Sequence, residues 1–370
     1  MTMESIDLST FRRNSHVSAD MARNKLLGII DAGRAKAAAT YEHAMTSVIE
    51  DSLVRDTAMS FDSASGDLVM RVDGSTIPLT DHALQQACTR YGMPAAYAKE
   101  LLQSESPIVR AIVGETLETR ARLENSGRAM VRAQGGKVRA VLSDSYKRID
   151  SRPMINTFVE ACQTLGLVPT DGHVTDTRIS IKAILPTLIQ PVPGEYMALG
   201  MQLKTSDYGA GAFYACMFAL RLVCNNGMTL EQVMKQVHLG RKLDEGTFSQ
   251  RTYTLDAETS QSALADVLRH SLQAENVQSI TNMLERSMQG GANYSAKDRL
   301  AALQKKGTIT KAEAKAIGEV YVEPDVEKLP PGNSDFRLAN AISWFAHSNE
   351  HSGDRRLDLE KLAGDILVKA

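Results

Sequence analysis

The segment VRAQGGKVRAVLSDSYKRIDSR, residues 131–152, predicts a β-hairpin followed by a helix. Two runs of alternating apolar residues flank Gly135-Gly136, and a Gly-Gly pair suits a two-residue hairpin turn. After the hairpin, Ser151 fits the N-cap of a helix and Pro153 fits its first turn. We therefore expect a strand, a turn, a second strand and a helix in this order.

The alternation of side chains divides the expected hairpin into two faces. With Gly135-Gly136 as the turn, Gln134 pairs with Lys137, and Arg132 lies opposite Arg139. One face is apolar and is the expected core side, formed by Ala129, Val131, Ala133, Val138, Ala140 and Leu142. The other face is basic and carries Arg128, Arg132, Lys137 and Arg139.

The expected pair of Arg132 and Arg139 needs a stabilising partner. Like charges directly opposite each other on a sheet are destabilising, so an anion or a carboxylate should lie between them. Arginine suits phosphate because its planar fork binds two oxygens at once. Three interpretations stay open: a solvated face whose charges block edge pairing, an anion-binding face, and a buried network of ion pairs within the protein.

Further basic residues extend the anion-binding interpretation beyond the hairpin. The following loop and helix start hold Tyr146, Lys147, Arg148 and Arg152. The alternating segment RISIK, residues 178–182, places Arg178 and Lys182 on one side of a strand. Cations that follow a phosphate backbone, together with an aromatic ring that stacks on bases, are what a single-strand groove needs. We therefore expect these cations to contact phosphates and Tyr146 to stack.

The rest of the chain predicts an α+β fold in three parts. Residues 18–57 are alanine-rich with apolar residues at helical spacing, and the chain after Phe248 is helical in pattern nearly to its end. We expect a helical N-terminal arm (1–59), an α+β core domain with a central mixed sheet (60–245), and a helical C-terminal region (246–370).

The expected core domain contains several strands and short helices. Two short helices around YGMP (91–94) fit either a helix-turn-helix or an ordinary helical corner. A capping box from Thr229 to Gln232 predicts a helix up to about His238. Strands are expected at 67–72, 76–79, 178–185, 196–205 and 211–224.

Composition sets limits on partners and location. The net charge is −2, but residues 120–242 hold 16 Lys and Arg against 9 Asp and Glu, so this middle is positive between acidic flanks. The four cysteines show no C-x-x-C spacing, and no apolar stretch is long enough to cross a bilayer. We expect a protein of the bacterial cytoplasm, without a cofactor and without membrane contact.

Signals for an enzyme are few. HSNEH, residues 347–351, matches the H-x-x-E-H zinc motif, with His347 and His351 as ligands, Glu350 as base and Glu360 as the candidate third ligand. A helix end with chance histidines is the other explanation. Cys224 fits a buried structural cysteine better than a nucleophile, and the sequence lacks the Lys-Ser/Thr of a P-loop. The sequence thus favours a binding protein over an enzyme.

Three segments resemble a phage- and plasmid-borne family of unknown function, the YafZ/YubP-like proteins. They are LTDHALQQACTRYGMPAAYAKELL, VRAVLSDSYKRID and FALRLVCNNGM, and the resemblance spans roughly residues 60–245. It implies a role in mobile-element DNA metabolism. Within the third segment, Arg221, Asn225 and Asn226 would support or extend a groove, or form a structural turn.

The expected core is also similar in architecture to phage single-strand annealing proteins of the RecT/Redβ/Erf type. This similarity implies a homo-oligomer, a ring or filament, that holds single-stranded DNA without nucleotide hydrolysis. We therefore expect an ATP-independent single-stranded DNA-binding or annealing protein that acts in recombination or replication, with acidic flanks at subunit contacts. The alternatives are a metal-dependent hydrolase that uses HSNEH, and a host-defence antagonist that binds an acidic protein partner.

Overall fold

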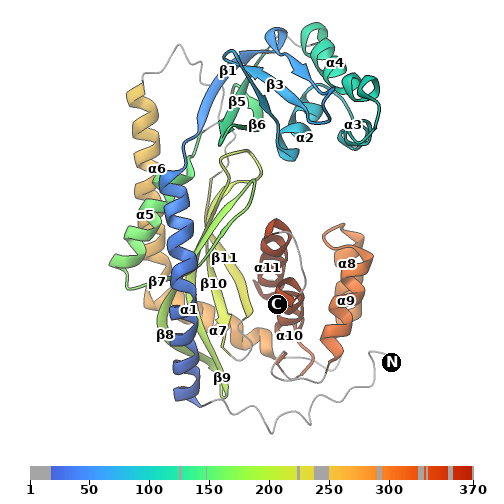
Figure 1. Cartoon of the computed structure of the whole chain (residues 1–370). Coiled ribbons are helices and arrows are strands. Elements are labelled where there is room, and N and C mark those ends of the chain that lie inside the picture. Colours follow the sequence, from blue (N-terminus) through green and yellow to red (C-terminus); the bar gives the residue numbers. More distant parts are fainter. Residues whose placement is uncertain are drawn as a thin grey trace.

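The computed structural model has the α+β architecture that the sequence predicts (Figure 1). It describes residues 18–124, 127–146, 148–222, 226–236, 250–289, 294–323, 329–330, 332–348 and 353–368. Small sheets with short helices form one part, at the top of Figure 1, and a larger sheet covered by helices forms the other.

The upper part combines two antiparallel sheets with short helices. In one sheet the order is β1 (Glu50–Arg55), β5 (Arg128–Gln134) and β6 (Lys137–Ser143). The other sheet contains β2 (Phe61–Asp62), β3 (Val69–Val72) and β4 (Ser75–Pro78), and η2 (Asp56–Ala58) follows β1. The helices are α2 (Asp81–Arg90), α3 (Ala95–Leu102) and α4 (Pro107–Glu124). Apolar side chains from both sheets and all three helices form one core, which fixes the hairpin β5–β6 against α2.

The larger part is built on an antiparallel meander in which neighbours in sequence are neighbours in the sheet. The expectation of a mixed sheet is therefore wrong, because short connections join consecutive strands and favour antiparallel pairing. Its strands are β7 (Val168–Val174), β8 (Ile179–Val192), β9 (Glu195–Thr205), β10 (Phe213–Arg221) and β11 (Asn226–Gln236). The apolar run of β10 is buried on both faces, as expected for a strand with covered faces. Helices therefore have to cover this sheet on both sides.

Helices from both ends of the chain cover the large sheet. Figure 1 shows α5 and α6 on one side of it and α10 and α11 on the other. The helices of this part are α1 (Ala19–Thr46), α5 (Ser151–Thr164), α6 (Gln250–Ser271), α7 (Ala274–Met288), α8 (Ala296–Lys305), α9 (Lys311–Val322), α10 (Asp335–Ser348) and α11 (Gly353–Val368). Of these, α8 packs on α9, and α9 packs on α10. One apolar core joins the sheet to the C-terminal helices, so α11 is an integral part of the fold.

Two segments differ from the sequence prediction. Residues 50–55, expected to be helical, form β1, which pairs antiparallel with β5. Residues 229–236, expected to be helical because of the capping box, belong to β11, which pairs with β10. In both cases a neighbouring strand needs partners for its backbone N–H and C=O groups, and this requirement outweighs a local helix signal.

The contact between α1 and β7 leaves no room for a side chain at Gly33. A Cβ atom built on Gly33 would overlap the carbonyl oxygen of Thr170 in β7. The same helix carries Gly28, where a Cβ atom would meet no atom within 4 Å. These glycines therefore separate the effect of close packing from the effect of helix propensity.

We expect Gly33→Ala to lower the free energy of unfolding by about 1–3 kcal/mol, because the added methyl group pushes α1 away from β7. The matched control Gly28→Ala should instead raise stability by about 0.5–1 kcal/mol, since alanine favours a helix over glycine. Urea denaturation of both variants measures the difference. Equal effects of the two substitutions would contradict the close packing of α1 on β7.

Candidate nucleic-acid interface

The hairpin β5–β6 has the predicted turn but a different register beyond it. Gly135 and Gly136 adopt positive φ angles of 59° and 71°, and Gln134 pairs with Lys137 as expected. The register then shifts, so that Arg132 pairs with Ala140. The expectation that Arg132 lies opposite Arg139 is therefore wrong, because β6 contains one extra residue at this point, and a bulged residue is left out of the pairing.

The shift also changes which face the later residues of β6 occupy. Val131 and Val138 lie in the core of the upper part, as predicted, but Val141 joins them there. Ala140 and Leu142, predicted for that same face, pack instead with Met130 and Tyr208 in a separate apolar cluster. A shift by one residue moves every following side chain to the opposite face of a strand.

Arg132 lies inside the protein and is paired with the protein's own acceptors. Its side chain is 1% exposed. Its guanidinium group donates to Asp51 (2.8 Å), Asp150 (2.7 Å) and the backbone oxygen of Asp207 (2.7 Å). The expectation that Arg132 contacts phosphate is therefore wrong, and the third interpretation, a network of internal ion pairs, applies to this residue.

Asp207 continues this network to the start of α5. Its carboxylate accepts from the backbone N–H (2.7 Å) and the hydroxyl (2.5 Å) of Ser151. Burial raises the pKa of Asp207 to about 6. Ser151 is the first residue of α5, after the N-cap residue Asp150, so it is not the cap itself. The unpaired N–H groups at the start of this helix thus receive an acceptor from the turn between β9 and β10.

Lys182 and Arg221 are also buried against carboxylates. Lys182 donates to Glu360 (2.8 Å), and Arg221 binds Glu195 through two nitrogens (2.9 and 2.8 Å). Because these cations lie in the interior, the expectation that they contact nucleic acid is wrong for both. Each cation is neutralised by its own carboxylate inside the fold, because a buried charge needs an opposite charge beside it.

The other predicted contact residues differ in exposure. Lys137 and Arg152 are exposed, and Arg128 and Arg148 are half-exposed. Tyr146 is partly buried, and its hydroxyl lies 3.4 Å from the backbone oxygen of Ser206. Partial burial leaves little of the Tyr146 ring open for stacking on a base. Lys147 and Asn225 lie outside the described residues, and only the backbone of Asn226, at the start of β11, is described.

The structure brings together two predicted arginines that are distant in sequence. Arg139 donates to Asp176 (3.0 Å), which precedes Arg178 by two residues, and its guanidinium group lies 5.5 Å from the ring centre of Tyr208. Arg178 donates to the backbone oxygen of Ala210 (3.0 Å) in the same turn that holds Tyr208. We call Lys137, Arg139 and Arg178 the junction strip.

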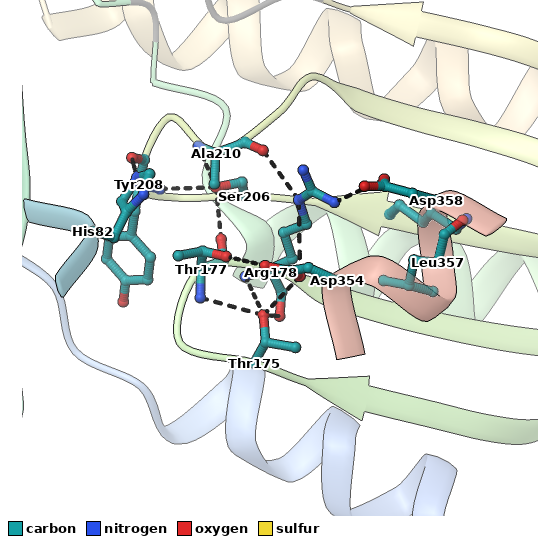
Figure 2. A network of polar contacts seen from close by, with 11 residues as sticks. His82, Thr175, Thr177, Arg178, Ser206, Tyr208, Ala210, Asp354, Leu357 and Asp358 are labelled. Carbon is teal, nitrogen blue, oxygen red and sulfur yellow. Dashed lines mark hydrogen bonds and ion pairs between the residues drawn. The ribbon is translucent and has the colours of Figure 1, made fainter. Parts of the chain in front are cut away.

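The turn between β9 and β10 positions the junction strip. His82 and Gln86 of α2 both donate to the backbone oxygen of Tyr208 (2.9 Å each), and Ser206 donates to the backbone oxygen of Thr177 (2.7 Å). Figure 2 shows this chain of contacts from His82 through Ser206 to Arg178. The upper part and the large sheet therefore meet at this turn.

Carboxylates at the surface pair with the two arginines of the strip. Asp176, the partner of Arg139, is 83% exposed. Asp358 of α11 accepts from Arg178 (3.2 Å) and is 52% exposed (Figure 2). Sequence reasoning missed Asp176 and Asp358. Asp358 stands four residues after Asp354, and this spacing puts both carboxylates on one face of a helix.

A small pocket between β7, β8 and α11 is lined by the predicted zinc-site residue Glu360. His347 does approach Glu360 (3.2 Å), but Lys182 (2.8 Å) and Arg356 (3.4 Å) occupy the same carboxylate. Glu350 and His351 lie outside the described residues, and among those described no group of three His, Cys, Asp or Glu could hold a metal ion. Two cations, Lys182 and Arg356, thus lie at the carboxylate that was predicted as the third ligand.

Family models, curated proteins and solved structures were all compared with this chain, and none of them matches it. The function is therefore inferred from the geometry of the site. Within the described residues, every helix is too short or too polar to cross a membrane.

Proposed function

We propose that the protein binds single-stranded DNA along the junction strip, without nucleotide hydrolysis. The observation that supports this is the meeting of Arg139 and Arg178 beside the turn between β9 and β10, with exposed carboxylates as partners. Lys137, two residues before Arg139, is exposed and extends the strip along the hairpin. Cations in a row can follow a phosphate backbone without reading a base sequence.

The exposure of the acidic partners makes exchange with phosphate possible. Arg139 and Arg178 are only 17% and 28% exposed, but their carboxylate partners face solvent. Pairs with such an exposed partner contribute about 0–1 kcal/mol, so little is lost when Asp176 or Asp358 gives up its arginine. The planar guanidinium group then binds two phosphate oxygens. The buried cations Arg132, Lys182 and Arg221 differ, because breaking their pairs would leave charges unpaired in the interior.

The wider biological role is part of the same proposal. Assembly into a ring or filament, annealing activity, and action in phage or plasmid recombination or replication agree with strand binding at a surface strip. Half-exposed Arg128 and Arg148 and exposed Arg152 would add further phosphate contacts.

Binding of labelled single-stranded and duplex DNA, measured at about 50–200 mM salt, tests the proposal. The affinity for single strands should fall with salt, with a log–log slope of about −0.7 for each phosphate neutralised. The double variant Arg139→Gln/Arg178→Gln should bind more weakly, and its slope should be flatter by about 1.4.

The matched control for this experiment is Arg269→Gln. Arg269 is an exposed arginine on α6 that pairs with exposed Asp266, so the substitution removes a positive charge outside the strip. It should leave affinity and slope close to those of the wild type. No measurable DNA binding at about 50 mM salt would refute the proposal and favour an acidic protein partner. Equal effects of the strip and control variants would refute the assignment of the strip.

A further inference from the structure

Helix α11 presents carboxylates to the basic side of β8. Asp358 accepts from Arg178 (3.2 Å), and Glu360 accepts from Lys182 (2.8 Å). Asp354 lies 3.8 Å from Arg178 and accepts from the hydroxyls of Thr175 (3.1 Å) and Thr177 (2.7 Å), as Figure 2 shows. Of the two cations that α11 contacts, only Arg178 belongs to the junction strip, and Asp354 and Asp358 lie against it where a phosphate would bind.

Burial divides these contacts into an inner anchor and an outer pair. Glu360 is 1% exposed, and Leu359 and Leu362 of the same helix lie in the apolar core. Asp358, by contrast, is 52% exposed and its partner Arg178 is 28% exposed. The outer pair can therefore open while α11 stays docked on the sheet.

We propose that the first turns of α11 compete with nucleic acid for Arg178, so that Asp358, supported by Asp354, acts as a built-in substitute for phosphate. This inference rests on the function proposed above, because it concerns regulation of the same strip. It predicts that the wild-type protein binds DNA more weakly than a variant in which Asp358 carries no charge. A strand gains Arg178 only when it displaces Asp358.

The electrostatics of the pair determine the size of the effect. A partly exposed ion pair contributes little to stability, so the competition is weak enough for a polyanion to overcome. Removing the charge of Asp358 should raise the affinity for single-stranded DNA by up to about fivefold, the equivalent of one surface ion pair. The salt dependence should change little, since the bound strand neutralises the same number of phosphates in the wild type and in the variant.

The test compares Asp358→Asn with Asp365→Asn in the full-length protein. Asp365 lies seven residues further along α11, about two helical turns, so both substitutions remove one negative charge from the same side of the same helix. Labelled single-stranded DNA is the probe, and affinity and salt slope are both measured. Asp358→Asn should bind more tightly than the wild type, while Asp365→Asn should change affinity much less.

A double variant shows whether the gain passes through Arg178. In an Arg178→Gln background, Asp358→Asn should bring no gain, because the competed cation is absent. A gain that persists there, or an equal gain from Asp365→Asn, would overturn the competition by α11 while leaving DNA binding intact. If the wild type and both single variants fail to bind DNA, the proposed function itself is refuted. If the wild type binds, Asp358→Asn binds more tightly and Arg178→Gln removes that gain, both proposals are supported.

Discussion

Replacing Glu360 by glutamine is expected to lower the free energy of unfolding by about 3–5 kcal/mol, the cost of breaking a buried ion pair. Glu360 is 1% exposed, and nitrogen atoms of Lys182 (2.8 Å), His347 (3.2 Å) and Arg356 (3.4 Å) contact its carboxylate. Glutamine has nearly the same shape but no charge. Lys182 would then stay buried without a negative partner.

Urea denaturation of the variant measures this loss, and two further variants control it. Glu319→Gln makes the same chemical change in an exposed pair with Lys315 on α9, and should cost less than about 0.5 kcal/mol. The double variant Lys182→Met/Glu360→Leu should recover most of the loss, because apolar residues of similar volume often replace a buried ion pair without cost. A loss in Glu360→Gln as small as that of Glu319→Gln would contradict the buried pair.

The same residue should make stability depend on pH in acid. Burial by itself would raise the pKa of Glu360, but Lys182 and His347 outweigh it and hold the pKa well below its usual value of 4.5. A carboxyl group whose pKa is lowered on folding stabilises the protein at pH values above its pKa in the unfolded chain. This stabilisation is lost as the pH falls through the pKa of the folded protein. The difference between wild type and Glu360→Gln should therefore be constant near neutral pH and shrink below about pH 4.5.

Replacing Arg132 by methionine is expected to lower the free energy of unfolding by about 2–4 kcal/mol. The substitution removes hydrogen bonds to Asp51, Asp150 and the backbone oxygen of Asp207, and leaves these acceptors facing one another. The loss is smaller than for Glu360, since half-exposed Asp150 can turn to water.

Arg269→Met is the matched control for Arg132→Met, since it makes the same exchange in an exposed pair on α6. It should change the free energy of unfolding by less than about 0.5 kcal/mol. Denaturant titration monitored by circular dichroism gives both values. If Arg132→Met were as stable as this control, the network around Arg132 would not hold the two parts of the protein together.

Local patterns were sufficient for most of the elements. Helical spacing correctly predicted that the described chain after Phe248 is mainly helical, and the Gly135-Gly136 pair forms the predicted turn. The predictions were wrong for β1 and β11, because their local sequences carry helix signals while the strands beside them need partners. Such needs arise from residues far away in the chain and leave no local pattern.

The candidate site was harder to predict than the fold. Alternation correctly placed Arg128 and Arg132 on the face of β5 opposite Val131. It could not show that Tyr208, from the turn between β9 and β10, packs on this second face of the hairpin. It also gave no sign of the shift in register next to Arg139. Burial of a strand's second face depends on what lies above it, and alternation does not contain this information.

The sequence by itself determined the α+β class, the hairpin turn, most helices and the positive charge of the central segment, because these follow from spacing and composition. Only the tertiary structure decided how each cation is used. It buries Arg132, Lys182 and Arg221 against carboxylates and leaves Arg139 and Arg178 near the surface. The physical reason is that a charge in the interior needs a partner within a few ångströms, and folding brings that partner from a distant part of the chain.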